Sequence, residues 1–317
     1  MLCASITVCK KQTVMTASGR ITTLIILVIV SLLAVLPIPH INTSDSLNCW
    51  MTQMPDDTPL HQLSIPGTHD SGARYSIADA AGKCQTLSIA DQLDIGVRFF
   101  DIRLQLVGDN LRIVHSFVDQ KQSFHDVLSD MLAFLDTHPG EVLLVSLKQD
   151  NAPKNARRPF AEVLEETLLS HPNRICTDRT LPQTLGEARG KLYLFSRYED
   201  ASVGLDCYHG WADNATFFGI DGLFVQDTYA PPDLGFKYEE IQTAMQIASD
   251  AAPLLTLNFA SCYLSGTIPP VYAGIPARQI NPWLIDTLSE QSSPIGVLLC
   301  DFMTEELARA IIEVNDR

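Results

Sequence analysis

The sequence reads Leu63-Ser-Ile-Pro-Gly-Thr-His-Asp-Ser-Gly72 where its first apolar run beyond the N-terminal segment comes to an end. That run covers Leu60–Ile65, and it leads within a few residues to the ionisable side chains of His69 and Asp70. Ionisable residues directly after a buried strand are typical of α/β enzymes, whose sites lie beyond the carboxyl ends of parallel strands. The stretch therefore predicts the first strand of such a sheet.

Short apolar runs recur along the chain and alternate with amphipathic, helix-like segments. Further runs cover residues 97–104, 111–114, 141–147, 191–195, 222–225, 254–257 and 295–300. The helix-like segments lie near residues 123–137, 157–170, 237–251, 280–291 and 304–315. Apolar runs separated by helices indicate a parallel sheet covered on both faces. We predict an α/β fold, a single TIM-type (β/α) barrel that is distorted or incomplete. The connection between residues 98 and 114 is too short for a helix, so a hairpin-like irregularity is expected there.

Ionisable side chains follow most of these runs. They are His69 with Asp70, Asp101 with Arg103, His115, Lys148, Arg197, Asp227 with Tyr229 close behind, and Asp301. Any one of them alone could be a helix cap or a solvated strand end. Because the carboxyl ends of barrel strands converge on one face, their succession instead predicts a shared catalytic site.

The collected residue types suit the cleavage of a phosphodiester. Histidine titrates near neutral pH, so a pair of histidines can act as general base and general acid. Arginine offers a planar fork of donors to phosphate oxygens, and a carboxylate can orient one histidine. No Ser nucleophile elbow and no phosphate-binding Gly-rich loop stands in the sequence. We predict acid–base catalysis with arginine in the place of a metal ion.

At these residues the sequence resembles the X domain of phosphatidylinositol-specific phospholipases C. The resemblance is carried by Leu63–Gly72, by Gln92-Leu-Asp-Ile-Gly-Val-Arg-Phe-Phe-Asp-Ile-Arg103 and by Val114-His115. It is strong over residues 57–150 and weaker but in register near residues 223–229, 257–259 and 296–302. The chain is most similar to the metal-independent, bacterial-type branch, since the calcium-dependent branch has Asn after its first histidine, whereas this chain has Asp70.

The resemblance implies a role for each residue of the proton-abstracting half of the site. His69 would be the general base that removes the proton of the inositol 2-hydroxyl, and Asp301 would be its partner. Arg103, assisted by Asp70, would stabilise the charge of the phosphorane. No metal ion and no other cofactor is implied.

The resemblance also implies how the leaving group departs and how the substrate is held. His115, supported by Asp101, would protonate the diacylglycerol oxygen. The inositol ring would be bound by four further residues, which are Lys148, Arg197, Asp227 and Tyr229. The products would be diacylglycerol and inositol 1,2-cyclic phosphate, made from phosphatidylinositol or from a glycosylphosphatidylinositol.

Two other functions are kept as alternatives. One is a metal-dependent barrel enzyme acting on glycerophosphodiesters, which predicts a His-Arg-Gly motif and Glu ligands that the sequence lacks. The other is a non-catalytic relative that binds lipids or glycans, in which a histidine or the arginine is expected to be lost. Fold alone does not decide between such functions.

Charge and the N-terminal segment bear on partners and location. The net charge of −15 disfavours a nucleic-acid partner and binding to an anionic bilayer by charge alone. The resemblance implies that the partner is an inositol phospholipid in a membrane surface, and we expect a monomer. The apolar run Ile21–Leu36 behind Arg20 predicts a signal peptide or signal anchor over residues 1–38. A linker over residues 39–56 and the catalytic barrel over residues 57–317 would follow. We expect a protein that is secreted or anchored facing the extracellular or lumenal side.

Cysteine usage agrees with export. Beyond the leader the chain carries Cys49, Cys84, Cys176, Cys207, Cys262 and Cys300. An even number of cysteines in an exported chain permits up to three disulfides, whose pairing the sequence does not define. No pair of cysteines has the spacing of a zinc site.

Overall fold

The computed structural model describes residues 47–76, 82–220, 222–250, 254–264 and 272–317. The predicted leader, residues 1–38, and residues 39–46 of the predicted linker lie outside these ranges. The described residues belong to one compact unit, Ser46–Arg317. No helix in these ranges is both long and apolar enough to cross a membrane.

A curved sheet forms the body of this unit. Its main path runs β6-β7-β5-β2-β1-β12-β11-β10-β9, and neighbours along the path are parallel except for β9, which runs antiparallel to β10. These strands are β1 (Ser64–Thr68), β2 (Phe99–Val107), β5 (Leu143–Gln149), β6 (Ile175–Cys176), β7 (Leu192–Arg197), β9 (Thr216–Ile220), β10 (Leu223–Gln226), β11 (Leu255–Phe259) and β12 (Gly296–Cys300). Because β6 and β9 end the path without pairing to each other in the described residues, the barrel is incomplete, as predicted.

The expected irregularity is an antiparallel extension of β2. β3 (Asn110–His115) pairs with the end of β2, and β4 (Val118–Ser123) pairs with β3. β8 (Leu205–Asp206) pairs with β7. The first strand starts later than predicted, because Leu60–Gln62 form a 3₁₀ turn, η4, instead of extended chain.

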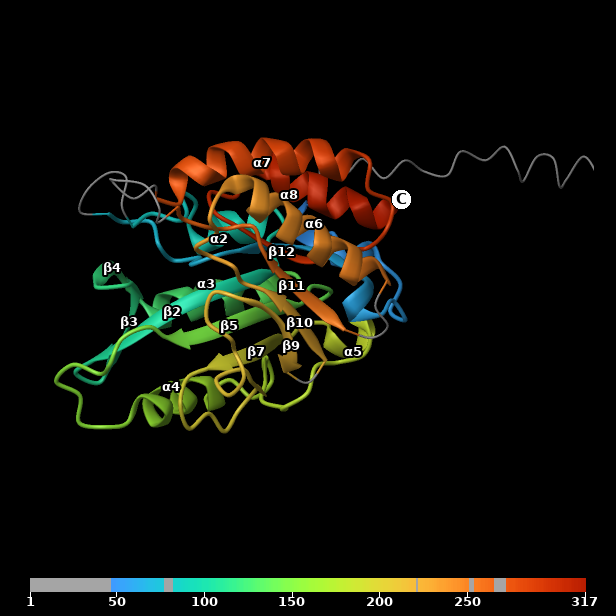
Figure 1. Cartoon of the computed structure of the whole chain (residues 1–317). Helices are drawn as coiled ribbons and strands as arrows, with labels where there is room; N and C mark the ends of the chain where they lie inside the picture. Colours follow the sequence, from blue (N-terminus) through green and yellow to red (C-terminus); the bar gives the residue numbers. More distant parts are fainter. Residues whose placement is uncertain (1–46, 77–81, 221, 251–253, 265–271) are drawn as a thin grey trace, which may run out of the picture. The chain divides into compact units, whose positions relative to one another are not determined.

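Helices cover the sheet (Figure 1). They are α2 (Ile89–Asp94), α3 (Phe124–Thr137), α4 (Phe160–Leu169), α5 (Leu185–Ala188), α6 (Leu234–Asp250), α7 (Gly274–Ser289) and α8 (Glu305–Ile312). Ser123 explains why α3 begins where it does, since its hydroxyl accepts from the Asp126 amide and the Asp126 carboxylate accepts from Ser123 in return. α8 packs against β1, and α7 packs against α8.

Alternate strand residues divide between two apolar clusters. Ile102, Val145 and Leu298 pack with the helices, whereas Leu144 and Val297 point into the other cluster, inside the curve of the sheet. This inner cluster also contains three buried residues that precede the first strand, Leu47, Trp50 and Met51. They lie in the stretch predicted to be a linker, so part of that stretch packs into the barrel.

Candidate active site

The strand ends bring the predicted residues together. His69 follows β1, Arg103 lies on β2, His115 ends β3 and Asp301 follows β12. β1 is the central strand between β2 and β12, and Gly67 lets these three strands approach closely. A Cβ atom there would lie 3.1 Å from Leu299 Cγ and 3.2 Å from Phe99 Cβ, closer than side chains normally pack. The parallel topology thus explains why residues far apart in sequence share one site.

His69 is held between a carboxylate and a guanidinium group. Its Nδ1 lies 2.8 Å from Asp301 Oδ1, and its Nε2 lies 2.8 Å from an Arg103 guanidinium nitrogen. A guanidinium can only donate, so Nε2 accepts, and the ring proton of neutral His69 sits on Nδ1 and is donated to Asp301. Burial lowers the pKa of His69, but the carboxylates of Asp301 and Asp101 outweigh burial and Arg103, and the net pKa lies above its usual value.

Arg103 is surrounded by carboxylates. Its guanidinium lies 3.2 Å from Asp101 Oδ2, 3.6 Å from Asp70 Oδ2 and 4.0 Å from Asp150 Oδ1. Burial alone would raise the pKa of Asp101, but Arg103 and Arg197 hold it well below its usual value. In Asp70 the effect of burial prevails, and its pKa is raised despite Arg103. The arginine is therefore fixed in place and charged, and it donates one N–H to the lone pair of His69 Nε2.

His115 is paired differently from what the resemblance implied. Its Nδ1 lies 2.9 Å from the Gly82 carbonyl, and its Nε2 lies 3.7 Å from Asp70 Oδ2. Asp101, the expected partner of His115, contacts Arg103 and accepts from the Ser146 hydroxyl at 3.2 Å. Asp101 is turned toward the arginines of the sheet, and the carboxylate next to His115 in the structure is Asp70.

The predicted substrate-binding residues lie on the next strands. Lys148 on β5 pairs with Asp150 at 3.1 Å, and Arg197 at the end of β7 lies 3.5 Å from Asp101 and 3.9 Å from Asp227. Burial and Arg103 lower the pKa of Lys148. These charges continue the Arg103 cluster across the sheet.

Tyr229 stands apart from these charges. Its hydroxyl donates to Asp213 at 2.8 Å, and its ring stacks on Tyr263 with centroids 6.0 Å apart. The sequence placed Tyr229 among the ring-binding residues, and in the structure it lies on the segment after β10 that also carries Asp227.

Several residues that sequence reasoning missed fix this arrangement. Trp211 stacks under the Arg197 guanidinium at 3.7 Å, and its indole nitrogen donates to Asp227 at 2.9 Å. The Gln85 amide donates to the carbonyls of His69 and Cys300, so it ties the ends of β1 and β12 together. These residues lie in loops, where no periodic signal marks them.

Lys237 on α6 supports the end of β10 from behind. Its ammonium is fully buried and donates to Gln226 Oε1 at 3.1 Å and to the Thr228 carbonyl at 2.7 Å. Burial lowers its pKa to about 8. A buried cation bonded to the backbone next to Asp227 fixes the position of that carboxylate.

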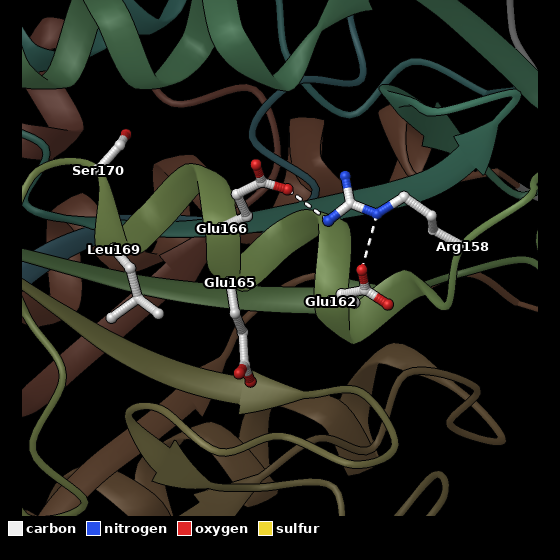
Figure 2. A pocket seen from close by; sticks show the side chains of 6 residues that line it. All are labelled: Arg158, Glu162, Glu165, Glu166, Leu169 and Ser170. Atoms are coloured by element: carbon white, nitrogen blue, oxygen red, sulfur yellow. Dashed lines mark hydrogen bonds and ion pairs between the residues drawn. The ribbon is translucent and has the colours of Figure 1, made fainter.

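A surface hollow elsewhere has no comparable chemistry. It lies along α4 and is lined by Arg158, Glu162, Glu165, Glu166, Leu169 and Ser170 (Figure 2). Arg158 pairs with Glu162 and Glu166, and Glu165 accepts from the Tyr198 hydroxyl. Its carboxylates are already partnered, so the strand-end cluster is the candidate site.

The cysteines expected to form disulfides are free thiols in the described structure. Cys49 and Cys176 are partly exposed, and Cys84, Cys207, Cys262 and Cys300 are buried. Cys84 lies inside the site. It belongs to both groups of side chains close enough to share a cation, one with His69 and Asp301 and one with Asp70 and His115.

Fold and site together define a barrel enzyme of the phosphodiesterase class. Comparison with known proteins identifies the family, since residues 57–198 match the model of "Phosphatidylinositol-specific phospholipase C, X domain". The chain is 30% identical over 285 residues to the 1-phosphatidylinositol phosphodiesterase of Listeria monocytogenes, and the match covers 87% of each chain. The protein therefore belongs to the family of phosphatidylinositol-specific phospholipases C with an X domain.

Staphylococcus aureus supplies a further sequence relative and a solved structure for comparison. Its 1-phosphatidylinositol phosphodiesterase is 33% identical over 211 residues, which cover 59% of this chain and 67% of that protein. A solved structure of the phosphatidylinositol-specific phospholipase C of S. aureus, determined in work on its membrane binding, superposes with a TM-score of 0.77. That match is 26% identical and covers 86% of this chain and 98% of the other.

Proposed function

We propose that the protein is a phospholipase C that cleaves phosphatidylinositol, or a glycosylphosphatidylinositol, to diacylglycerol and inositol 1,2-cyclic phosphate. The observation that carries this proposal is the fixed row Asp301–His69–Arg103, with spacings of 2.8 Å at both contacts. The row places the basic nitrogen of His69 directly beside a cation. A phosphodiester bound to Arg103 with a neighbouring hydroxyl would present that hydroxyl to His69.

The first half of the reaction uses this row. His69 Nε2 takes the proton of the inositol 2-hydroxyl, and the alkoxide attacks phosphorus within the same molecule. Asp301 stabilises the imidazolium that forms. Arg103 stabilises the phosphorane oxygens with charge-assisted hydrogen bonds, while Asp101 and Asp70 hold the guanidinium in position.

The second half needs an acid on the opposite side of the phosphate. His115 donates Nδ1–H to the Gly82 carbonyl, so its Nε2 is free to deliver a proton to the diacylglycerol oxygen. The carboxylate of Asp70 lies 3.7 Å from this nitrogen. The bond between phosphorus and this oxygen breaks, and the cyclic phosphate remains.

Recognition of the inositol ring falls to the predicted residues of the next strands. We infer that Lys148, Arg197 and Asp227 bind ring hydroxyls and that Tyr229 packs on the ring face. Trp211 supports this role, because its contacts with Arg197 and Asp227 hold both groups in one orientation before substrate arrives.

The lipid part of the substrate lies on the His115 side. Phe117, in the turn that follows His115, is 85% exposed. Since the chain is strongly acidic, attraction to an anionic bilayer by charge is weak, and an exposed aromatic ring offers an apolar contact instead. We infer that Phe117 enters the membrane beside the leaving group.

The leader and location are proposed from the sequence. Residues 1–38 would direct the chain into the secretory route as a signal peptide or anchor, the linker would follow, and the barrel would act outside the cell or in a lumen as a monomer. Protease protection of intact cells or vesicles, with and without detergent, tests this placement.

Phosphorus NMR of the products tests the proposed function. The full-length protein is incubated in excess EDTA with phosphatidylinositol in mixed micelles. We expect a cyclic inositol phosphate signal that is abolished by His69→Ala and kept in His125→Ala, a control at an exposed position on α3. Absence of turnover would favour a lipid- or glycan-binding role. Turnover only with an added divalent metal would favour the metal-dependent alternative.

A further inference from the structure

Cys84 occupies a place in the site that the proposed reaction does not use. Its side chain is 1% exposed, and its backbone is fixed by hydrogen bonds to Ala73 and from Phe302. Its Sγ and ligand atoms of Asp70 and His115 all lie within 4.8 Å of one another. A thiol, a carboxylate and an imidazole thus face a common point.

His115 is oriented as a metal-binding histidine usually is. Its Nδ1–H is donated to the Gly82 carbonyl, which fixes the tautomer and leaves the lone pair of Nε2 directed toward Asp70. Metal-bound histidines characteristically donate their second ring nitrogen to a carbonyl or carboxylate in this way.

Asp70 supplies an independent indication. Its side chain is fully buried, and neither carboxylate oxygen accepts a hydrogen bond in the described structure. Arg103 lies 3.6 Å and the His115 ring 3.7 Å from its Oδ2, both beyond hydrogen-bond distance. Buried carboxylates normally have their lone pairs satisfied, so Asp70 retains coordinating capacity next to Cys84.

We propose that Asp70, Cys84 and His115 form a binding site for a divalent cation that favours thiolate, such as Zn²⁺, and that its binding inhibits the enzyme. Sulfur, nitrogen and oxygen ligands together suit Zn²⁺ and disfavour Mg²⁺ or Ca²⁺. Water would fill the remaining position of a tetrahedral ion. The Cys84 thiol loses one proton to solvent on binding, as coordinating thiols do.

Three features keep such binding reversible. The Arg103 guanidinium near Asp70 repels a cation, and the thiol must be deprotonated in a buried place. Typical Zn–ligand distances of about 2.0–2.3 Å also require the three side chains to move closer together. We therefore assign the ion an inhibitory role and no structural one.

Inhibition, unlike binding, rests on the proposed function. A cation on Nε2 removes the lone pair that must carry the proton to the leaving oxygen, and it draws Asp70 away from Arg103. Binding and inhibition are consequently measured separately.

The test uses full-length protein freed of metal with EDTA and then transferred to chelator-free buffer. Co²⁺ is added while sulfur-to-cobalt charge-transfer absorption is recorded, and Zn²⁺ is added in activity assays normalised to each variant's own metal-free rate. The variants are Cys84→Ala, the closer-sized Cys84→Ser, and Cys176→Ala as a control at a partly exposed cysteine. Circular dichroism checks the fold of each.

We expect the absorption in the wild type and Cys176→Ala and its loss in both Cys84 variants, which should also need at least tenfold more Zn²⁺ for half inhibition. Charge-transfer absorption or Zn²⁺ sensitivity unchanged in the folded Cys84 variants would overturn the site. If the absorption depends on Cys84 but metal-free protein shows no turnover, the site stands and the proposed function fails. If metal-free protein turns over but Co²⁺ gives no such absorption, the proposed function stands and the metal site fails.

Discussion

Replacing Asp301 by Asn tests how the acid–base chemistry is tuned. Asp301 is 2% exposed and its carboxylate accepts from His69 at 2.8 Å, so little solvent screens the pair. The carboxylate raises the pKa of His69, whereas burial and Arg103 lower it. With Asn in place of Asp301, burial and Arg103 dominate, and the pKa of His69 falls. His69 acts as a base only when it is neutral, so the fall in rate at low pH follows its pKa. This acid limb of the pH–rate profile must therefore move to lower pH.

The size of the effect follows from the contact. A hydrogen bond to a charged group contributes about 1.5–3 kcal/mol. At about 1.4 kcal/mol per pKa unit, the acid limb should move down by about one to two pH units. The same charge stabilises the imidazolium formed during attack, so kcat at the plateau should fall roughly 10- to 100-fold. If the Asn amide donates to Nδ1, the ring proton moves to Nε2 and the basic lone pair is lost. The loss of kcat would then increase to about 10⁴-fold.

The assay is the pH dependence of kcat/KM on a soluble inositol phosphodiester. Asp213→Asn is the matched control, since Asp213 contacts Tyr229 rather than His69 and its replacement should leave the acid limb in place. An acid limb that stays put or moves to higher pH in Asp301→Asn would refute the assignment of His69 as the base.

Three further changes probe other parts of the molecule. His115→Ala should slow phosphatidylinositol cleavage by about 10²–10⁴-fold but slow a nitrophenyl analogue much less, because nitrophenolate leaves without a proton; equal losses would argue against an acid role. Phe117→Ser should weaken vesicle binding roughly tenfold or more, from a burial of about 1.5–3 kcal/mol, and spare soluble substrate, and unaltered vesicle binding would place the membrane contact elsewhere. Glu141→Gln leaves the fully buried Arg98, now 2.9 Å from its carboxylate, without a counter-charge. It should cost about 3–5 kcal/mol in urea unfolding, and a loss under about 1 kcal/mol would contradict this.

Much of the fold could be predicted because its strands are buried along their whole length. β12 is a continuous apolar run and β11 is apolar at alternate residues, and both lie close to their predicted positions. β9 was missed, since Thr216–Ile220 is an edge strand with an exposed and irregular pattern. The apolar run that begins at Leu60 predicts a strand there, but Leu60 is buried in a 3₁₀ turn. Hydrophobicity reports burial, and only its period distinguishes the backbone conformations.

The site was predictable to the level of topology and no further. Parallel strands place their ends on one face, which is why His69, Arg103 and Asp301 could be grouped from the sequence. The direction of each side chain could not be predicted in this way. The carboxylate next to His115 belongs to Asp70, which lies in the segment after β1. Trp211 lies in a loop, whose path depends on tertiary packing.

The most direct test of the central claim is whether the enzyme needs the substrate's own hydroxyl. Phosphatidylinositol and its 2-deoxy analogue are compared in mixed micelles containing EDTA, with diacylglycerol release as the measurement. If His69 activates the 2-hydroxyl, the natural lipid is cleaved and the 2-deoxy lipid is not, although it competes for binding. Release of diacylglycerol from the 2-deoxy lipid at a comparable rate would show that water is the nucleophile and contradict the account.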